Sequence, residues 1–486
     1  MGAAAQAWRA ALPPVHACFT ASLLALSAYH AVPAAAQERD TVSLTESTIA
    51  WSTAKYAVTA ENDFVDGSLD TKTIVDRTFR TYVIENRYLK VTLLPAFGGR
   101  ILSIIYKPTG HEQLYRTEVG VPYGMKGRTF YYDWMMVYGG IFPTLPDAEH
   151  GKTWLKPWEF AVVKNSADEV TVSMSIIDDF AYSGAPPQFR RGASGIAAAY
   201  HVTLKAGRAA LDTRLVLKNT RGEAFDYEYW TCATFAPGSD PKQPKATGGA
   251  EIIAPITAYT TPRWSANIAE GDERAEAGRS RFEKLRLFKN WPTMGIAYAA
   301  PDMQGGNFWG VINHDNEVGI IRIADNRITP GLKMWTWGFA SLANAATARS
   351  DPRPDQPYVE LWAGVSDQFF HPARFPASGE VSVTETYSPT VGMSNVTHAS
   401  DKVLVNLSAS ASAVTLQFIS IEPDTPLRVT LKRGETALFD ESMKPDPAKG
   451  NRVSAPLVDG KPGETIRLTI RAADGNELIA AETQTK

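Results

Sequence analysis

Apolar and polar residues alternate over short stretches along most of the chain. The stretch 210–217 reads Ala-Leu-Asp-Thr-Arg-Leu-Val-Leu, and its leucines all fall on one of the two alternating sets of positions. A period of two places these leucines on one face of a β-strand. Similar stretches, short and rich in β-branched or apolar residues, are 83–94, 169–177, 198–205 and 310–323. Helical periodicity with capping residues is scarce, and only 270–289 is charged enough for a short surface helix or an ordered loop. We therefore predict an all-β protein.

The composition changes between residues 388 and 397. Before this region, 360–363 and 381–387 have the pattern of two closing strands of a large sheet. After it, Phe418 and Phe439 are the only aromatic residues, while alternating stretches continue at 403–407, 414–419, 427–432 and 465–471. We predict a large β-sandwich over 80–392, preceded by N-terminal strands or an extension over 37–79. A small β-sandwich of immunoglobulin-like size is predicted over 396–486.

The first 36 residues have the pattern of a secretory signal peptide. Arg9 is their only charged residue, the apolar run Ala17 to Tyr29 follows it, and Ala34 to Ala36 supply the small residues of a cleavage site. We expect cleavage between Ala36 and Gln37, and a secreted or periplasmic mature protein. The apolar run is too short to span a bilayer and no later stretch reaches about 18 apolar residues, so no membrane span is predicted.

Composition narrows the possible functions. The chain has 49 Lys and Arg against 52 Asp and Glu, so it lacks the basic excess that nucleic-acid binding requires, and we predict no nucleic-acid partner. Cys232 would be the single cysteine left after signal cleavage, which excludes an internal disulfide. No complete Gly-x-x-x-x-Gly-Lys-Ser/Thr phosphate loop and no Gly-x-Ser-x-Gly elbow occur, and we predict no cofactor. The 12 Trp and 18 Tyr residues suit a β-rich core or stacking on sugar rings.

Candidate chemistry concentrates in short glycine-containing motifs. These are Phe97-Gly98-Gly99-Arg100, Tyr138-Gly139-Gly140-Ile141-Phe142-Pro143, Glu149-His150-Gly151 and Pro157-Trp158-Glu159. Paired glycines permit a close backbone approach beside a pocket. The imidazole of His150 can bond sugar hydroxyls or move a proton, and the guanidinium of Arg100 suits hydroxyl or carboxylate recognition. Each motif is weak evidence by itself, whereas their order along the chain is more specific.

The order of these motifs resembles the galactose mutarotase-like superfamily. Residues 330–338 (PGLKMWTWG), 358–364 (YVELWAG) and 85–95 (ENRYLKVTLLP) look like bacterial mutarotase-like domains of the DUF5107 type. The resemblance covers most of 80–390 and implies a galactose mutarotase-like β-supersandwich. It does not fix the activity, because one fold supports several chemistries.

The resemblance also suggests roles for individual residues. Glu360 matches the strand glutamate that serves the related epimerases as catalytic base, and His150 matches a histidine that contacts the sugar. The family's proton donor is a second histidine, and Trp230 occupies its place here. This departure leaves Tyr229, Glu228 or His150 as the acid, or points to different chemistry or to binding alone.

Several functions remain open. A glycosidase could pair Glu360 with Glu228, Asp133 or Glu149, and a polysaccharide lyase could use Arg100, Lys152 and His150. A metal site formed by Asp147, Glu149 and His150 is a weaker alternative, and we predict no metal. Trp335 and Trp337 share a strand face and could form a sugar platform.

Substrate and function follow from these residues. Because Arg100 and Lys152 would place positive charge beside the tryptophans, we expect an oligosaccharide ligand that includes acidic sugars. The predicted function is a carbohydrate-active enzyme of epimerase, hydrolase or lyase type. The alternatives are a non-catalytic glycan-binding protein and a structural envelope protein.

Overall fold

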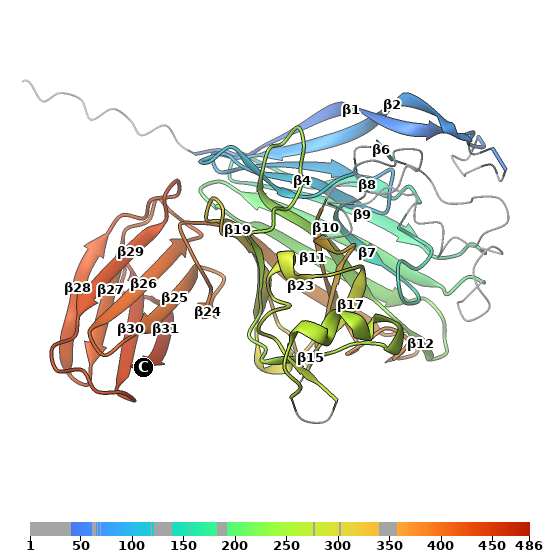
Figure 1. Cartoon of the computed structure of the whole chain (residues 1–486). Coiled ribbons are helices and arrows are strands. Elements are labelled where there is room, and N and C mark those ends of the chain that lie inside the picture. Colours follow the sequence, from blue (N-terminus) through green and yellow to red (C-terminus); the bar gives the residue numbers. More distant parts are fainter. Residues whose placement is uncertain are drawn as a thin grey trace, which may run out of the picture. The chain divides into compact units, whose positions relative to one another are not determined.

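The computed structural model describes residues 40–486 apart from 61–64, 66, 69, 118, 121–138, 155, 182–191, 276–277, 301–302 and 340–356. The predicted signal peptide and its cleavage site, as well as Asp133 and Tyr138, lie outside the described residues. The all-β prediction is confirmed, because the described chain consists mainly of antiparallel strands (Figure 1). Its helical segments are short 3-10 turns: η1 (Arg263–Gly271), η2 (Phe288–Asn290) and η3 (Met303–Gly305). Among the described residues, no helix has the length and apolar character that a membrane span needs.

One large sheet carries most of the residues that matter for function. Within the described chain its order is β16-β15-β17-β20-β21-β13-β5-β4-β3-β2-β1-β6, and β7 pairs with both β13 and β4. Its strands are β1 (Ser43–Lys55), β2 (Asp70–Glu85), β3 (Leu89–Leu94), β4 (Arg100–Tyr106), β5 (His111–Leu114), β6 (Val119–Gly120), β7 (Gly140–Thr144), β13 (Trp230–Ser239), β15 (Ala258–Thr260), β16 (Ser280–Arg281), β17 (Gly295–Ala300), β20 (Gly331–Thr336) and β21 (Val359–Gly364). Only β1 and β6 pair in parallel among these strands.

A second sheet packs against the first. Its order is β14-β18-β19-β23-β11-β10-β9-β8. The strands are β8 (Glu159–Asn165), β9 (Glu169–Ile177), β10 (Ile196–Lys205), β11 (Leu211–Asn219), β14 (Ala250–Ile253), β18 (Phe308–Asn313), β19 (Val318–Ala324) and β23 (Glu380–Val391). A separate ribbon pairs β12 (Phe225–Tyr227) with β22 (Ala373–Phe375). Strand β11 alternates buried and more exposed residues along its length, as its leucine pattern predicts.

Two predicted strands are in fact strand pairs. The stretch 83–94 turns at Asn86, whose side-chain oxygen accepts the backbone N–H groups of Tyr88 and Leu89 and so separates β2 from β3. The stretch 310–323 folds back between β18 and β19 as a hairpin. Apolar and polar residues alternate in both strands of a hairpin, so the alternation does not show where one strand ends and the next begins. The residues of the turn set these strand ends. The charged stretch 270–289 contains β16 but no long helix in its described part, which agrees with the ordered-loop alternative.

The C-terminal region forms a small β-sandwich of two four-stranded sheets. One sheet has the order β24-β25-β26-β29 and the other β28-β27-β30-β31. Their bounds are β24 (His398–Ala399), β25 (Val403–Ala409), β26 (Ala413–Ser420), β27 (Leu427–Arg433), β28 (Thr436–Met443), β29 (Asn451–Pro456), β30 (Thr465–Ala472) and β31 (Glu477–Gln484). Side chains such as Leu416, Phe418 and Leu468 fill a core of their own between the two sheets.

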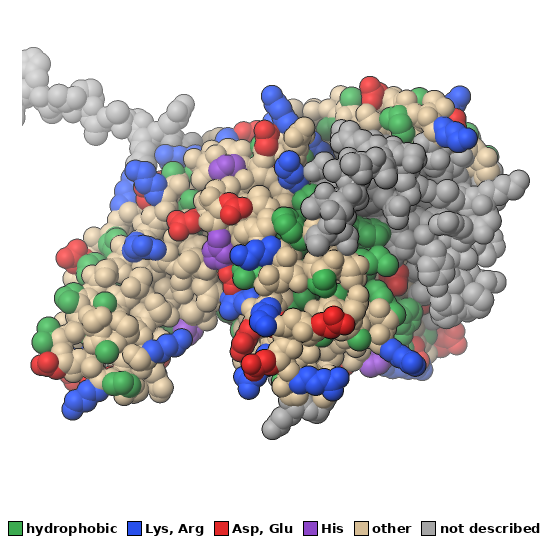
Figure 2. All heavy atoms as spheres, in the orientation of Figure 1, with side chains coloured by type: hydrophobic (Ala, Val, Ile, Leu, Met, Phe, Trp, Pro, Cys, Tyr) green, Lys and Arg blue, Asp and Glu red, His purple; other side chains and the backbone are tan. Residues whose placement is uncertain are grey.

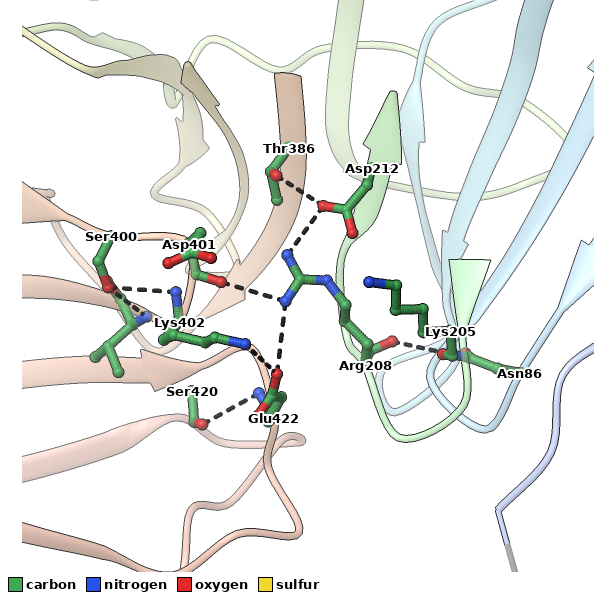
Figure 3. Close-up of polar contacts among 11 residues, drawn as sticks. Asn86, Lys205, Arg208, Asp212, Thr386, Ser400, Asp401, Lys402, Ser420 and Glu422 are labelled. Atoms are coloured by element: carbon green, nitrogen blue, oxygen red, sulfur yellow. Dashed lines mark hydrogen bonds and ion pairs between the residues drawn. The ribbon is translucent and has the colours of Figure 1, made fainter. Parts of the chain in front are cut away.

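The C-terminal strands also contact the rest of the chain. Leu404, Ile419 and Ile421 are buried within the large hydrophobic core rather than in the small one. Figure 3 shows the polar part of this contact around Arg208, which lies in the turn between β10 and β11. Its guanidinium pairs with Asp212 at 2.9 Å and approaches Glu422 to 3.7 Å. On the face drawn in Figure 2, acidic and basic side chains are interspersed, as the near-neutral charge of the chain leads one to expect.

Candidate functional site

Strand register gathers the candidate residues on one face of the large sheet. Trp335 lies opposite Glu360, and Lys333 opposite Trp362, across β20 and β21. Across β13 and β21, Cys232 lies opposite Trp362. Directly paired residues point to the same side of a sheet, so these side chains share a face. The residues between them, Leu361 among them, point to the opposite face. We call the shared face of β7, β13, β21, β20 and β17 the site face.

Glycines make room on this face for Trp230. A Cβ atom at Gly364 would lie 2.3 Å from the Trp230 ring, and one at Gly331 would lie 3.0 Å from it. The Trp230 indole is fully buried and its Nε1 donates to Glu228 Oε2 at 3.0 Å. Trp230 is therefore a wall of the site, fixed by packing and by one hydrogen bond.

A buried ion pair lies at the centre of the site face. Lys333 Nζ is 2.7 Å from Glu360 Oε1, and the two side chains are 4% and 3% exposed. The indole Nε1 of Trp362 donates to the same oxygen at 2.5 Å. Among the described residues, no hydrogen bond involves Glu360 Oε2. The carboxylate is thus oriented through Oε1, which accepts from both Lys333 and Trp362.

Aromatic rings surround the Lys333 ammonium. Its nitrogen is 4.1 Å from the ring centroid of Trp362, 5.3 Å from that of Phe369 and 5.5 Å from that of Trp335. Cation–π contacts of this kind stabilise a partly desolvated ammonium. They hold Lys333 in place beside Glu360, in an environment where charge interactions are stronger than in water.

Two further carboxyl groups, Glu149 beside this pair and Glu228 beside Trp230, have perturbed acidity. Burial raises the pKa of Glu149 to about 7; the Lys333 ammonium opposes this rise and the Glu360 charge adds to it. Burial likewise raises the pKa of Glu228 to about 7, although hydrogen bonds from Trp230 and from the Phe370 backbone oppose the rise. Each group therefore titrates near neutral pH and can exchange a proton there.

His150 lies beside the site as an uncharged, packed ring. It is 5% exposed, and its centroid is 4.3 Å from that of Trp154 and 5.0 Å from that of Trp362. Burial, together with the positive charges of Lys333 and Arg100, holds the pKa of His150 well below its usual value. His150 is therefore packed among aromatic rings, and its contact with Trp362 keeps it close to Glu360.

Arg100 and Lys152 do not present their charge to this site, contrary to prediction. The Arg100 guanidinium is fully buried, donates to the carbonyl oxygens of Phe97 and Gly139, and stacks 3.8 Å above the Phe142 ring. It fastens the loops before β4 and β7. Lys152 Nζ forms a buried ion pair with Asp178 at 2.8 Å. Both cations interact with groups inside the fold, because a buried charge needs partners close to it.

Tyr229, a predicted site residue, points away from the site face. Its hydroxyl bonds the Thr231 hydroxyl, and Thr231 bonds Glu385 Oε2 at 3.2 Å. Glu385 belongs to β23 of the second sheet and pairs with Arg322. Tyr229 therefore faces the sandwich interior. One residue further on, Trp230 faces the site, because successive side chains of an extended chain point to opposite faces.

Trp335 and Trp337 are neighbours whose rings meet edge to face, and their role as a sugar platform stays a prediction. Trp335 and Trp337 have ring centroids 5.5 Å apart, and Trp337 Nε1 donates to the Tyr358 hydroxyl at 2.6 Å. Trp264, from η1, lies 6.3 Å from Trp335 and is 58% exposed. Sequence reasoning missed Trp264 because η1 lies outside the alternating stretches that marked the strands.

The site also contains Lys333, Trp362 and Phe370, which the sequence motifs did not single out as site residues. Lys333 is two residues from Trp335, and Trp362 is two residues from Glu360, so period two could have placed both on the site face. Phe370 lies in a loop and offered no such signal. Among the described residues, no group of three His, Cys, Asp or Glu side chains is placed to hold a metal ion, so the Asp147, Glu149 and His150 alternative has no support there.

Comparison with known proteins identifies the family. The sequence-family model for the domain of unknown function DUF5107 matches residues 63–380. The chain belongs to the DUF5107 family. A second model, the second domain of YphG-like proteins, matches residues 398–481, which lie within the small C-terminal sandwich.

Solved structures resemble this DUF5107 protein at low sequence identity. A TPR-domain-containing protein from Parabacteroides distasonis matches with a TM-score of 0.54 and 18% identity, covering 73% of this chain and 56% of that one. A galactose mutarotase-like protein from Clostridium acetobutylicum matches with a TM-score of 0.42 and 11% identity, over 64% of this chain and 95% of that one. One from Lactobacillus casei matches with a TM-score of 0.40 and 10% identity, over 64% and 100%. The resemblance to DUF5107-type domains predicted from the motifs is therefore confirmed.

Proposed function

We propose that this DUF5107 protein is a carbohydrate-active enzyme that moves a proton at a sugar ring, with Glu360 as the base. The observation that carries the proposal is the Lys333–Glu360 pair, buried on the site face among Trp335, Trp362 and Phe369. Aromatic faces suit the apolar faces of pyranose rings, and convergent polar groups within an apolar wall are typical of ligand sites. The mutarotase-like fold agrees with a sugar ligand.

The proposed chemistry divides the work between two carboxyl groups. Glu360 is oriented by donors on Oε1, and Oε2 can accept a proton from a sugar hydroxyl or ring carbon. Glu149, with its pKa near 7, is partly protonated at neutral pH and can return a proton. Pairs of titratable groups with different environments are the usual basis of acid–base assignments. Glu149 thus takes the role of the missing second histidine.

The charges at the site favour a neutral sugar over an acidic one. The expectation of uronic acids rested on Arg100 and Lys152, and both are engaged inside the fold. Lys333, the cation that does reach the site face, is already paired with Glu360. Glu149 and Glu228 add negative charge as pH rises. A carboxylate-bearing sugar would meet repulsion there, so neutral sugars are the proposed substrate class.

The test is a panel of neutral mono- and oligosaccharides incubated with the wild-type protein and with Glu360→Gln. Anomeric exchange by NMR reports epimerase activity, new reducing ends report hydrolysis, and ultraviolet absorbance of an unsaturated product reports lyase activity. We expect one of these signals, reduced by about 10²–10⁴ in Glu360→Gln. If the variant turned over the sugar at a rate within threefold of wild type, Glu360 would not be the base.

Binding without catalysis is the second candidate, and one observation favours it. Trp230 stands where the related epimerases have their proton-donating histidine, and its indole N–H is committed to Glu228. A protein that only binds sugars would show a sugar-dependent thermal shift but no turnover of the same sugar. The panel therefore separates the two candidates.

The proposed location is outside the cytoplasm. The support is the signal-peptide pattern of residues 1–36. Mass spectrometry of the protein from its native cells should find Gln37 at the N-terminus; a chain that retains residues 1–36 would contradict the proposal.

A further inference from the structure

Two exposed aromatic side chains flank the site. In the described chain, Trp264 and Phe370 are the only tryptophan or phenylalanine among the exposed large apolar side chains, at 58% and 54% exposure. Trp264 belongs to the 3-10 helix η1 and Phe370 to a turn after β21, so neither lies in the large sheet. Large exposed aromatic surfaces are unfavourable in water unless a ligand or partner covers them. Their position next to the candidate site suggests that the covering group is the ligand.

A row of side chains connects these two residues through the Lys333–Glu360 pair, and its inner rings (Trp335, Trp362 and Phe369) are 5%, 0% and 6% exposed, so the two ends are its open aromatic surfaces. Trp264 lies 6.3 Å from Trp335, and Lys333 Nζ lies 5.5 Å from the centroid of Trp335 and 4.1 Å from that of Trp362. The row continues from Trp362 to Phe369 at 5.4 Å and from Phe369 to Phe370 at 6.4 Å. We call these six residues the aromatic track. The ion pair lies within the track, with an exposed ring at each end.

The ends of the track are held in fixed positions. Phe370 has a φ of 66°, a left-handed backbone conformation that is costly for a residue with a bulky side chain. Its backbone N–H donates to Glu228 Oε1 at 2.8 Å, which supports this conformation. At the other end, the Ser265 hydroxyl bonds both the backbone N–H and the carbonyl of Ile296 on β17, and so fixes the start of η1 next to Trp264. Backbone segments that are fixed in advance lose little entropy on binding.

We propose that Trp264 and Phe370, the exposed ends of the aromatic track, bind the two ends of a neutral oligosaccharide of at least three sugar residues, with an internal residue at Glu360. This inference rests on the proposed function for the role of Glu360. At least one further ring separates each exposed end from the ion pair, so a single sugar at Glu360 does not cover Trp264 or Phe370. A chain with a residue on either side covers both. The carboxyl groups of Glu149 and Glu228 select against uronic acids along the same path.

The experiment measures how binding depends on chain length. Isothermal titration calorimetry is carried out with cello-, malto-, xylo-, manno- and galacto-oligosaccharides of one to five residues, and with oligogalacturonates of the same lengths. The variants are Trp264→Ala and Phe370→Ala, and Val458→Ala serves as a control because it removes an exposed apolar side chain, 71% exposed, from the C-terminal sandwich. Thermal unfolding confirms that each exposed-site variant is folded.

For at least one neutral series we expect the dissociation constant to fall with each residue up to three or more. Each aromatic variant should weaken trisaccharide binding by about tenfold, which corresponds to about 1.4 kcal/mol, and leave monosaccharide binding within twofold. The control should match wild type. Trisaccharides that bind no more tightly than monosaccharides, unchanged trisaccharide binding in both aromatic variants, or tighter binding of oligogalacturonates would overturn the inference.

The same samples separate this inference from the proposed function. Length-dependent binding without turnover of any bound sugar supports the track and rejects the enzyme. Turnover of a monosaccharide without any length dependence supports the enzyme and rejects the track. If no sugar of any length binds, both are wrong.

Discussion

The Lys333–Glu360 pair allows a quantitative test of the site. Replacing Glu360 by Gln keeps the shape and leaves a carbonyl oxygen that can accept from Lys333 and Trp362, but it removes the negative charge. Lys333 then remains as a buried, uncompensated ammonium, since its side chain is only 4% exposed. Removing one partner of a buried pair typically costs about 3–5 kcal/mol. Because the hydrogen bonds can persist, we expect a loss at the lower end, about 3 kcal/mol of unfolding free energy.

A double-mutant cycle isolates the interaction itself. Lys333→Met should also cost about 3 kcal/mol, because it leaves the carboxylate of Glu360 unpaired. The double variant removes both charges, so its loss should be smaller than the sum of the single losses by about 2 kcal/mol. Urea unfolding at pH 7, followed by tryptophan fluorescence, measures all four proteins.

A matched control comes from the interior of the same sandwich. Glu385 forms a buried pair with Arg322 at 2.5 Å, with side chains 2% and 0% exposed. Glu385→Gln should be destabilising too, but its effect should add to that of Lys333→Met within about 0.5 kcal/mol. Additivity of the Lys333 and Glu360 variants would refute the reasoning, because it would mean that the pair does not interact in the folded protein.

Three further predictions concern neighbouring features. Because the pKa of Glu149 is raised to about 7, folding favours its protonated form, so this group should contribute a loss of up to about 3 kcal/mol of stability as pH rises from 4.5 to above 7. Urea unfolding at pH 5 and pH 8 should show a smaller fall in Glu149→Gln; an identical fall would contradict the shift. Lys152→Met should lower stability by about 3 kcal/mol, because it leaves the buried Asp178 carboxylate without its ion-pair partner. Sugar affinity measured by calorimetry should stay within twofold of wild type. A large loss of affinity would show that Lys152 does belong to the site. Gly364→Ala should cost about 3 kcal/mol by displacing the Trp230 indole, and an unchanged denaturation midpoint would show that the ring can move without cost.

Local patterns in the sequence were sufficient for the strands and for part of the site. The alternation in β11, the spacing of Trp335 and the motif containing Glu360 depend only on neighbours in the chain, and period two assigns each of them a face. The same short range explains the errors at strand ends. Asn86 breaks the stretch 83–94 through a side-chain hydrogen bond that hydrophobic alternation does not record.

Tertiary structure decided which charges and rings meet. Lys333 and Glu360 are 27 residues apart and become partners only because β20 and β21 pair in one register. Arg100 and Lys152 looked equally suitable for a ligand, but partners from distant parts of the chain draw both into the interior. Trp264 and Phe370 reach the site from loops. The sequence by itself determined the all-β architecture and the types of chemical group available, because those depend on local pattern and composition. The long-range pairing of strands and the burial of charge determined where each group acts.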